Sequence, residues 1–137
     1  MGLKEDEKNV IVKYRLERAN DTLLDVKFAI QNMRWHNAVN RLYYACFYAA
    51  IALLLNDGYT VRTHNGVKTQ LGLHYENEGK ISEELMKSYR KMFNLRQTGD
   101  YDDLTVVTPN EVLDLLEPAQ QFITAIENLI KDEHANF

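Results

Sequence analysis

The sequence predicts an all-α fold, an up-and-down bundle of four to five helices that forms one domain over residues 1–137. Apolar residues recur at spacings of three and four along most of the chain, which is the period of an amphipathic α-helix, and strand-like alternation does not compete with it. Helix-stop and helix-capping residues separate the periodic stretches. The length of 137 residues and the composition, 45% hydrophobic and 26% charged, suit a single folded domain with a core of its own.

The first two predicted helices are long. The first runs from about Glu5 to Met33, and the second begins near Trp35 and ends at the stop signal Asn56-Asp57-Gly58. The apolar stripe of the first consists of Val12, Leu16, Ala19, Leu23, Val26, Ile30 and Met33. The second helix is apolar around more of its circumference, but its run from Leu42 to Leu55 is shorter than the ~20 residues that a membrane-spanning helix needs. We therefore expect it to be a buried core helix in which Cys46 is an inert thiol.

Capping residues predict where the remaining helices begin. Thr63 is expected to cap a third helix that extends to Tyr75, although Gly66 and Gly72 weaken it by roughly 1 kcal/mol each. A fourth helix should begin after Ser82 and run to about Thr98. Thr108, Pro109 and Glu111 supply the cap, the first residue and the capping-box acid of a fifth helix, in which Pro118 predicts a kink or a split.

Charge and composition exclude several classes of function. A net charge of −4 gives no broad positive field for duplex DNA, but a few clustered cations could still bind a nucleotide or single-stranded RNA. One cysteine and an N-terminus without an apolar segment predict a cytoplasmic protein. The four histidines lack metal-ligand spacing, and no Gly-rich phosphate loop or hydrolase elbow is present, so we expect neither a metal nor a cofactor.

Arg96 is the most unusual residue of the predicted fourth helix. It follows Leu85, Tyr89 and Met92 on one face, where an inward-facing guanidinium needs an anionic or polar partner. Asp100 is one turn further on, so a simple intrahelical ion pair is the alternative interpretation. Tyrosines on the shoulder of the second helix, such as Tyr44, can likewise be explained as packing residues.

Three motifs in series give the sequence a family resemblance. They are Asn40-Arg41-x-Tyr43-Tyr44-Ala45, Thr63-His64-x-x-Val67-Lys68 and Arg96-x-x-x-Asp100-Tyr101. In this order and at this separation they resemble the HEPN superfamily, and in particular its small stand-alone bacterial and archaeal members that lack the motif histidine.

The resemblance implies a HEPN-like bundle, a homodimer, and a cleft between the ends of the two fourth helices that binds a nucleotide or RNA phosphate. It assigns catalytic positions to Arg96, Asp100 and Tyr101, and ligand-binding positions to Asn40, Arg41, Tyr44, His64 and Lys68. It also implies a toxin-antitoxin-like system or a nucleotidyltransferase partner protein. Neither a membrane nor duplex DNA is expected as a partner.

One departure from the family pattern bears on catalysis. Ribonuclease members carry Arg-x(4 to 6)-His, in which the histidine helps to transfer protons without a metal. Here Tyr101 stands five residues after Arg96, and a phenol is a poor proton shuttle at neutral pH. Two alternatives to simple binding remain open: a metal-independent ribonuclease toxin in which Tyr101, Asp100 or a dimer-mate's His64 replaces the imidazole, and a non-catalytic structural adaptor.

Overall fold

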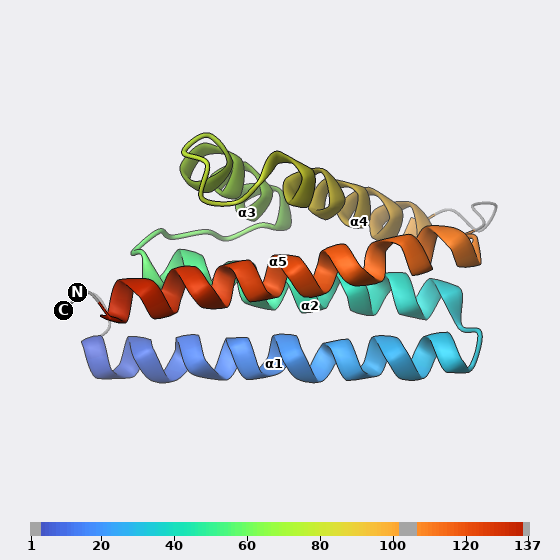
Figure 1. Cartoon of the computed structure of the whole chain (residues 1–137), viewed down its shortest axis with the longest axis horizontal. Helices are drawn as coiled ribbons and strands as arrows, with labels where there is room; N and C mark the ends of the chain where they lie inside the picture. The colour runs from blue at the N-terminus through green and yellow to red at the C-terminus, as the bar shows by residue number, and fades with distance from the viewer. Residues whose placement is uncertain (1–3, 102–106, 136–137) are drawn as a thin grey trace.

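The computed structural model describes the backbone of residues 4–101 and 107–135, and the side chains of residues 4–96 and 107–134. Five α-helices form the described part of the chain: α1 (Glu5–Gln31), α2 (Trp35–Asn56), α3 (His64–Leu71), α4 (Glu83–Tyr101) and α5 (Pro109–Ala135), with a π-helical turn, η1 (Gly72–Glu76), after α3. The three long helices α1, α2 and α5 lie side by side, and α3 and α4 cover them from one side (Figure 1). The all-α bundle that the sequence predicts is confirmed.

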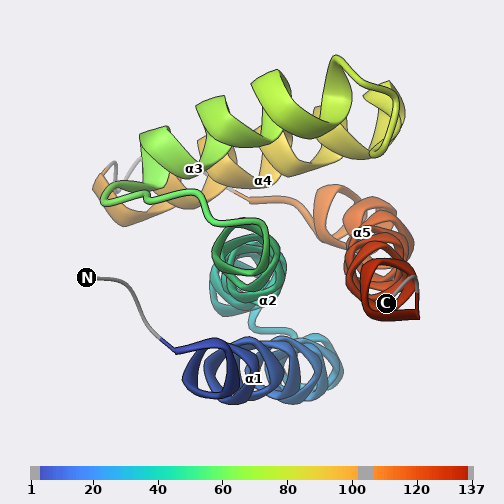
Figure 2. The same ribbon diagram turned by 90° about the vertical axis from the view of Figure 1, so that its left-hand side faces the viewer.

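Helix α2 is the centre of the bundle. In the end-on view it lies between α1 and the layer formed by α3 and α4, with α5 on its flank (Figure 2). By length and apolar composition alone α2 could cross a membrane, but most of its residues are buried against the other helices. Cys46 is fully buried, as expected, and burial raises the pKa of its thiol well above the ordinary value.

The predicted caps are found where the sequence places them. The Thr63 hydroxyl accepts a hydrogen bond from the backbone N–H of Gly66 at 2.8 Å, and the Ser82 hydroxyl accepts one from Leu85 at 3.1 Å. Thr108 and Glu111 form the expected reciprocal pair at the start of α5. These contacts span only three residues, which is why the sequence alone predicts them.

Three sequence expectations need correction. Met33 is 73% exposed and adopts a positive φ of 56° just beyond the end of α1. It is therefore neither part of the helix nor part of the buried stripe of α1. Helix α4 continues to Tyr101, beyond the expected end at Thr98. No split occurs at Pro118, because Leu115 and Ala119 are both buried and hold the helix against the bundle on either side of it.

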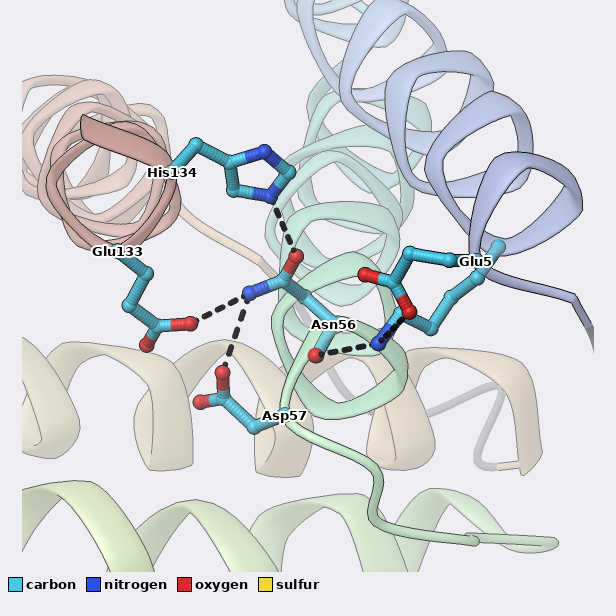
Figure 3. Close-up of polar contacts among 6 residues, drawn as sticks. Glu5, Asn56, Asp57, Glu133 and His134 are labelled. Atoms are coloured by element: carbon cyan, nitrogen blue, oxygen red, sulfur yellow. Dashed lines mark hydrogen bonds and ion pairs between the residues drawn. The ribbon is translucent and has the colours of Figure 1, made fainter. Parts of the chain in front are cut away.

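The start of α1, the end of α2 and the last turn of α5 meet in a polar cluster at one end of the bundle (Figure 3). This terminal cluster consists of Asn56, Asp57, Glu133 and His134, with Lys8 beside it. The Asn56 amide donates to Glu133 at 2.7 Å and to Asp57 at 3.1 Å, and its oxygen pairs with His134 Nε2 at 3.0 Å. One side chain therefore joins α2 to the last turn of α5, while Lys8 donates from α1 to the Asn56 carbonyl.

Candidate anion-binding site

Helices α2, α3 and α4 bring together most of the residues that the sequence analysis selects. Arg96 reaches from α4 onto two neighbouring rings of α2: its guanidinium carbon lies 4.9 Å from the centre of the Tyr43 ring and 5.8 Å from that of Tyr44. Its Nη1 lies 3.5 Å from the Tyr44 hydroxyl. Arg41 approaches the Tyr44 ring as well, at 5.2 Å. Two cations thus share one half-buried aromatic ring, and we call Arg41, Tyr44, His64 and Arg96 the arginine–tyrosine site.

Asn40 contributes to this site by positioning Arg41. Its side-chain oxygen accepts hydrogen bonds from Arg41 Nε at 3.1 Å and from Nη2 at 2.7 Å. These two bonds leave Nη1 of the guanidinium, and one remaining N–H of Nη2, for a ligand. Asn40 therefore fixes the orientation of a cation that the sequence alone places only on the shoulder of α2.

His64 is held by three aromatic rings. It packs against Phe47 in a tilted arrangement with ring centres 4.4 Å apart, and it lies edge-on to Tyr44 at 5.8 Å. Its Nδ1 is 2.7 Å from the hydroxyl of the fully buried Tyr43. Burial raises the pKa of Tyr43 to about 12, so the phenol keeps its proton and is assigned as the donor to Nδ1.

The electrostatic environment keeps His64 neutral. Partial burial and then the positive charge of Arg96 lower the pKa of its imidazole below the ordinary value. With Nδ1 accepting from Tyr43, the ring proton belongs on Nε2. His64 is therefore arranged as a hydrogen-bond donor and not as a cation.

Lys68 lies one ring away from the arginine–tyrosine site. Its ammonium nitrogen sits 4.2 Å from the centre of the Phe93 ring, and Phe93 in turn packs edge-on against Tyr43. Lys68 adds positive charge near the site without contacting Tyr44 in the described structure. The side chains of Asp100 and Tyr101 lie outside the described residues, and so does any Arg96–Asp100 contact.

The structure gives roles to residues that the sequence analysis did not assign to the site. Phe47 holds His64 together with Tyr43, which was only a motif position, and Arg18 from α1 lies 4.6 Å above the Tyr48 ring and donates to its hydroxyl at 2.8 Å. Tyr48 packs against Tyr44, so the aromatic surface extends toward α1. The tyrosines and Phe47 recur at three- and four-residue spacings, but the same pattern describes an ordinary helix surface, so it could not identify these partners.

These observations define a class of protein: a small helical bundle that presents paired guanidinium groups on an aromatic surface. The HEPN domain family model matches residues 12–129. The chain belongs to the HEPN domain family, as the three sequence motifs predict.

Known relatives agree with this assignment. The chain is 42% identical over 127 residues to a UPF0332 protein of Thermotoga maritima, in an alignment covering 93% of this chain and 96% of the relative. It is 33% identical over 117 residues to a Methanocaldococcus jannaschii protein that bears the name "Putative toxin MJ0605", covering 85% of this chain and 87% of that protein. The crystal structure of TT1696 from Thermus thermophilus is similar in fold, with a TM-score of 0.73 at 18% identity over 85% of this chain and 96% of that one.

Proposed function

We propose that the arginine–tyrosine site binds a phosphate group of a nucleotide or of RNA. The observation that carries the proposal is the approach of Arg41 and Arg96 to one ring, that of Tyr44, at 5.2 and 5.8 Å. Two guanidinium groups this close to one ring repel each other, and an anion that contacts both would relieve the repulsion. Guanidinium groups suit phosphate because their planar N–H forks match its oxygens in pairs.

The neighbouring groups fit the same ligand. The Tyr44 hydroxyl and the Nε2–H of His64 are neutral donors that can complete the coordination of a phosphate without adding charge. The half-buried ring of Tyr44 offers a face for a nucleobase. Both features favour a nucleotide over a free inorganic anion.

The biological setting is part of the proposal. Two relatives from Methanocaldococcus jannaschii carry toxin names. Together with the family resemblance, these names support a cytoplasmic toxin-antitoxin-like or nucleotidyltransferase-associated system in which this chain works as a homodimer. Sedimentation velocity tests the homodimer directly, because a single species of monomer mass at micromolar concentration would contradict it.

Titration with AMP and with a short RNA tests the binding function. Arg96→Ala should weaken binding of both ligands about 10- to 50-fold, because it removes one of the two cations that face the phosphate. Lys91→Ala is the matched control, since Lys91 is an exposed cation on the same helix, α4, and should leave affinity unchanged. Equal affinities for the parent and Arg96→Ala would overturn the proposal and favour a structural adaptor, in which only thermal stability changes.

A ribonuclease toxin is the second candidate, and the position of His64 favours it over a purely structural role. The imidazole lies in the same chain as Arg96 and contacts the same two tyrosines, Tyr43 and Tyr44. A general base, however, needs a free nitrogen lone pair, and Nδ1 of His64 already accepts from Tyr43. RNA cleavage with His64 as the general base would thus require the hydrogen bond between Tyr43 and His64 to break.

Incubating the protein with RNA in the presence of a chelator separates the two functions. Metal-free cleavage that both Arg96→Ala and His64→Asn abolish would establish the ribonuclease with His64 as its proton-transfer group. Cleavage that depends on Arg96 alone would direct attention to Asp100 and Tyr101. Binding without cleavage would leave the phosphate-binding function.

A further inference from the structure

A cavity lies beside the arginine–tyrosine site and shares His64 with it. Its volume is about 220 Å³, and it is bounded by α1, α2, the segment between α2 and α3, and the start of α3. The residues that line it include Arg15, Phe47, Arg62 and His64. Cavities for drug-sized ligands typically measure about 300–1,000 Å³, so this one suits part of a single nucleotide and not a larger ligand.

The cavity combines an apolar interior with two guanidinium groups. Phe47, Ile51, Val61 and Val67 supply the apolar surface, and Arg15 and Arg62 supply the charge. Arg15 is half-buried and donates through Nη1 to the Ile51 carbonyl at 3.1 Å, which fixes its head at the cavity. Within the side chains that the structure describes, the ion pairs are Lys8–Glu5, Lys80–Glu78 and Arg90–Glu76, so Arg15 and Arg62 have no carboxylate partner there.

A partly buried cation without a counter-ion is costly, and an incoming anion would offset the cost. At Arg15, burial disfavours the charged form of the guanidinium and so lowers its pKa. Five of the seven arginines of this acidic chain, residues 15, 18, 41, 62 and 96, line either this cavity or the aromatic surface beside it. Their clustering against the net charge of −4 indicates a localised site for a polyanion.

His64 connects the two sites. Its ring packs against Phe47 in the cavity and lies edge-on to Tyr44 in the arginine–tyrosine site. A ligand that occupies both sites would therefore be near His64 in each. A mononucleotide held by its phosphate at Arg41 and Arg96 would leave the charge of Arg15 and Arg62 without a counter-ion.

We propose that the cavity of Arg15, Phe47, Arg62 and His64 is a second nucleotide subsite, so that the ligand of this protein is a single-stranded oligonucleotide and not a mononucleotide. One phosphate binds Arg41 and Arg96, and the adjoining nucleotide places its base against Phe47 and its phosphate between Arg15 and Arg62. This inference rests on the proposed phosphate-binding function and extends it to the length of the ligand.

Affinities for AMP and for the dinucleotide pApA test the subsite. The parent should bind pApA about tenfold or more tightly than AMP, because the second nucleotide adds one stacking contact and one phosphate contact. Arg62→Ala should bring the affinity for pApA down to that for AMP while leaving AMP binding unchanged. Arg62 is an exposed residue outside the helices, so this variant should keep the parent's helical circular dichroism and melting temperature.

Two controls make the outcomes distinct. Arg96→Ala should weaken both ligands, and Lys131→Ala, which removes an exposed cation from α5, should weaken neither. Equal affinities of the parent for AMP and pApA, or equal losses for both ligands in Arg62→Ala, would overturn the second subsite and leave the proposed function standing. If the parent binds neither ligand, both the proposed function and the subsite are wrong.

The corresponding deoxydinucleotide identifies the source of the oligonucleotide. Tighter binding of the RNA dinucleotide than of the DNA one would assign the two subsites to RNA, since the 2′-hydroxyl is the group that differs. Equal binding would assign them to single strands of either kind.

Discussion

The arginine–tyrosine site and the terminal cluster lie on the same helix, α2, yet they use their polar groups in opposite ways. In the terminal cluster the Asn56 amide serves Asp57, Glu133 and His134 at once, and a cation, Lys8, lies against the Asn56 carbonyl (Figure 3). Its donors and acceptors meet within the protein. In the arginine–tyrosine site and the cavity beside it, the described groups are mainly cations and aromatic rings, with no carboxylate among the residues that define them.

This contrast separates a structural polar cluster from a binding site. A cluster whose donors and acceptors satisfy one another stabilises the fold, because its formation needs nothing from outside. A cluster dominated by one charge sign is stabilised by a ligand of the opposite sign. The terminal cluster should therefore control stability, and the arginine–tyrosine site should control ligand affinity.

Asn56→Ala gives the largest expected change. It leaves the partners of a 9% exposed amide without their shared donor, so the free energy of unfolding should fall by about 2–3 kcal/mol. Urea denaturation measures the change, and nucleotide affinity of the folded variant should stay at the parent's value. Asn128→Ala on the exposed face of α5 is the matched control, for which a change below about 0.5 kcal/mol is expected.

Arg41→Ala should produce the reverse pattern. Loss of one of the two guanidinium groups should weaken AMP binding about tenfold, which corresponds to about 1.4 kcal/mol, while the free energy of unfolding changes little. Isothermal titration and urea denaturation of the same preparation measure both quantities. If the variant loses stability but keeps its affinity for AMP, Arg41 is a packing residue, and the two clusters do not differ in the way described.

Tyr43→Phe removes the donor to Nδ1 of His64 and should cost about 1 kcal/mol of stability. Because that hydrogen bond favours the neutral imidazole, its loss should raise the pKa of His64 toward the ordinary value. Histidine NMR signals followed against pH measure the shift, with His36, an exposed residue of α2, as the internal reference. An unchanged His64 titration would refute the assigned direction of the hydrogen bond.

Glu133→Gln has the smallest expected effect of these variants, and it concerns how the free energy of unfolding depends on pH. Burial, followed by the neighbouring Asp57 carboxyl, raises the pKa of Glu133 to about 7. Between pH ~4.5 and ~7 the folded state binds more protons than the unfolded state, so this carboxyl stabilises the fold at low pH and loses that contribution as pH rises through about 7. The glutamine variant should lack this decline, which we expect to be about 1 kcal/mol after allowing for solvent screening. Melting curves at pH 5 and pH 8 measure it.

Much of the fold could be predicted because its signals are local. Thr63, Ser82 and Thr108 cap helices through atoms within three residues, and the inward stripe of α1 needs only the helical period. Met33 lies outside the buried stripe, and α5 does not split at Pro118, for a common reason. The local tendency of each residue is real, but the position of neighbouring helices decides whether a side chain is buried or a helix survives a proline.

The site could be predicted only as a set of residues. Three motifs identified Arg41, Tyr44, His64 and Arg96, but nothing in the sequence indicated that Asn40 orients Arg41 or that Phe47 and Tyr43 hold His64. Arg15 and Arg62 lie 47 positions apart and match no motif, so they remained ordinary surface cations until the fold joined them in one cavity.

The helices, their starting points, the family and the residue types at the site follow from the amino-acid sequence, because they depend on periodicity, capping and motif order. The packing of the helices brings two arginines to one tyrosine, places the Tyr43 hydroxyl against Nδ1 of His64, and sets a second pair of arginines around a cavity. The reason is physical: hydrogen bonds within a helix turn are encoded by adjacent residues, whereas contacts between helices depend on how the bundle packs as a whole.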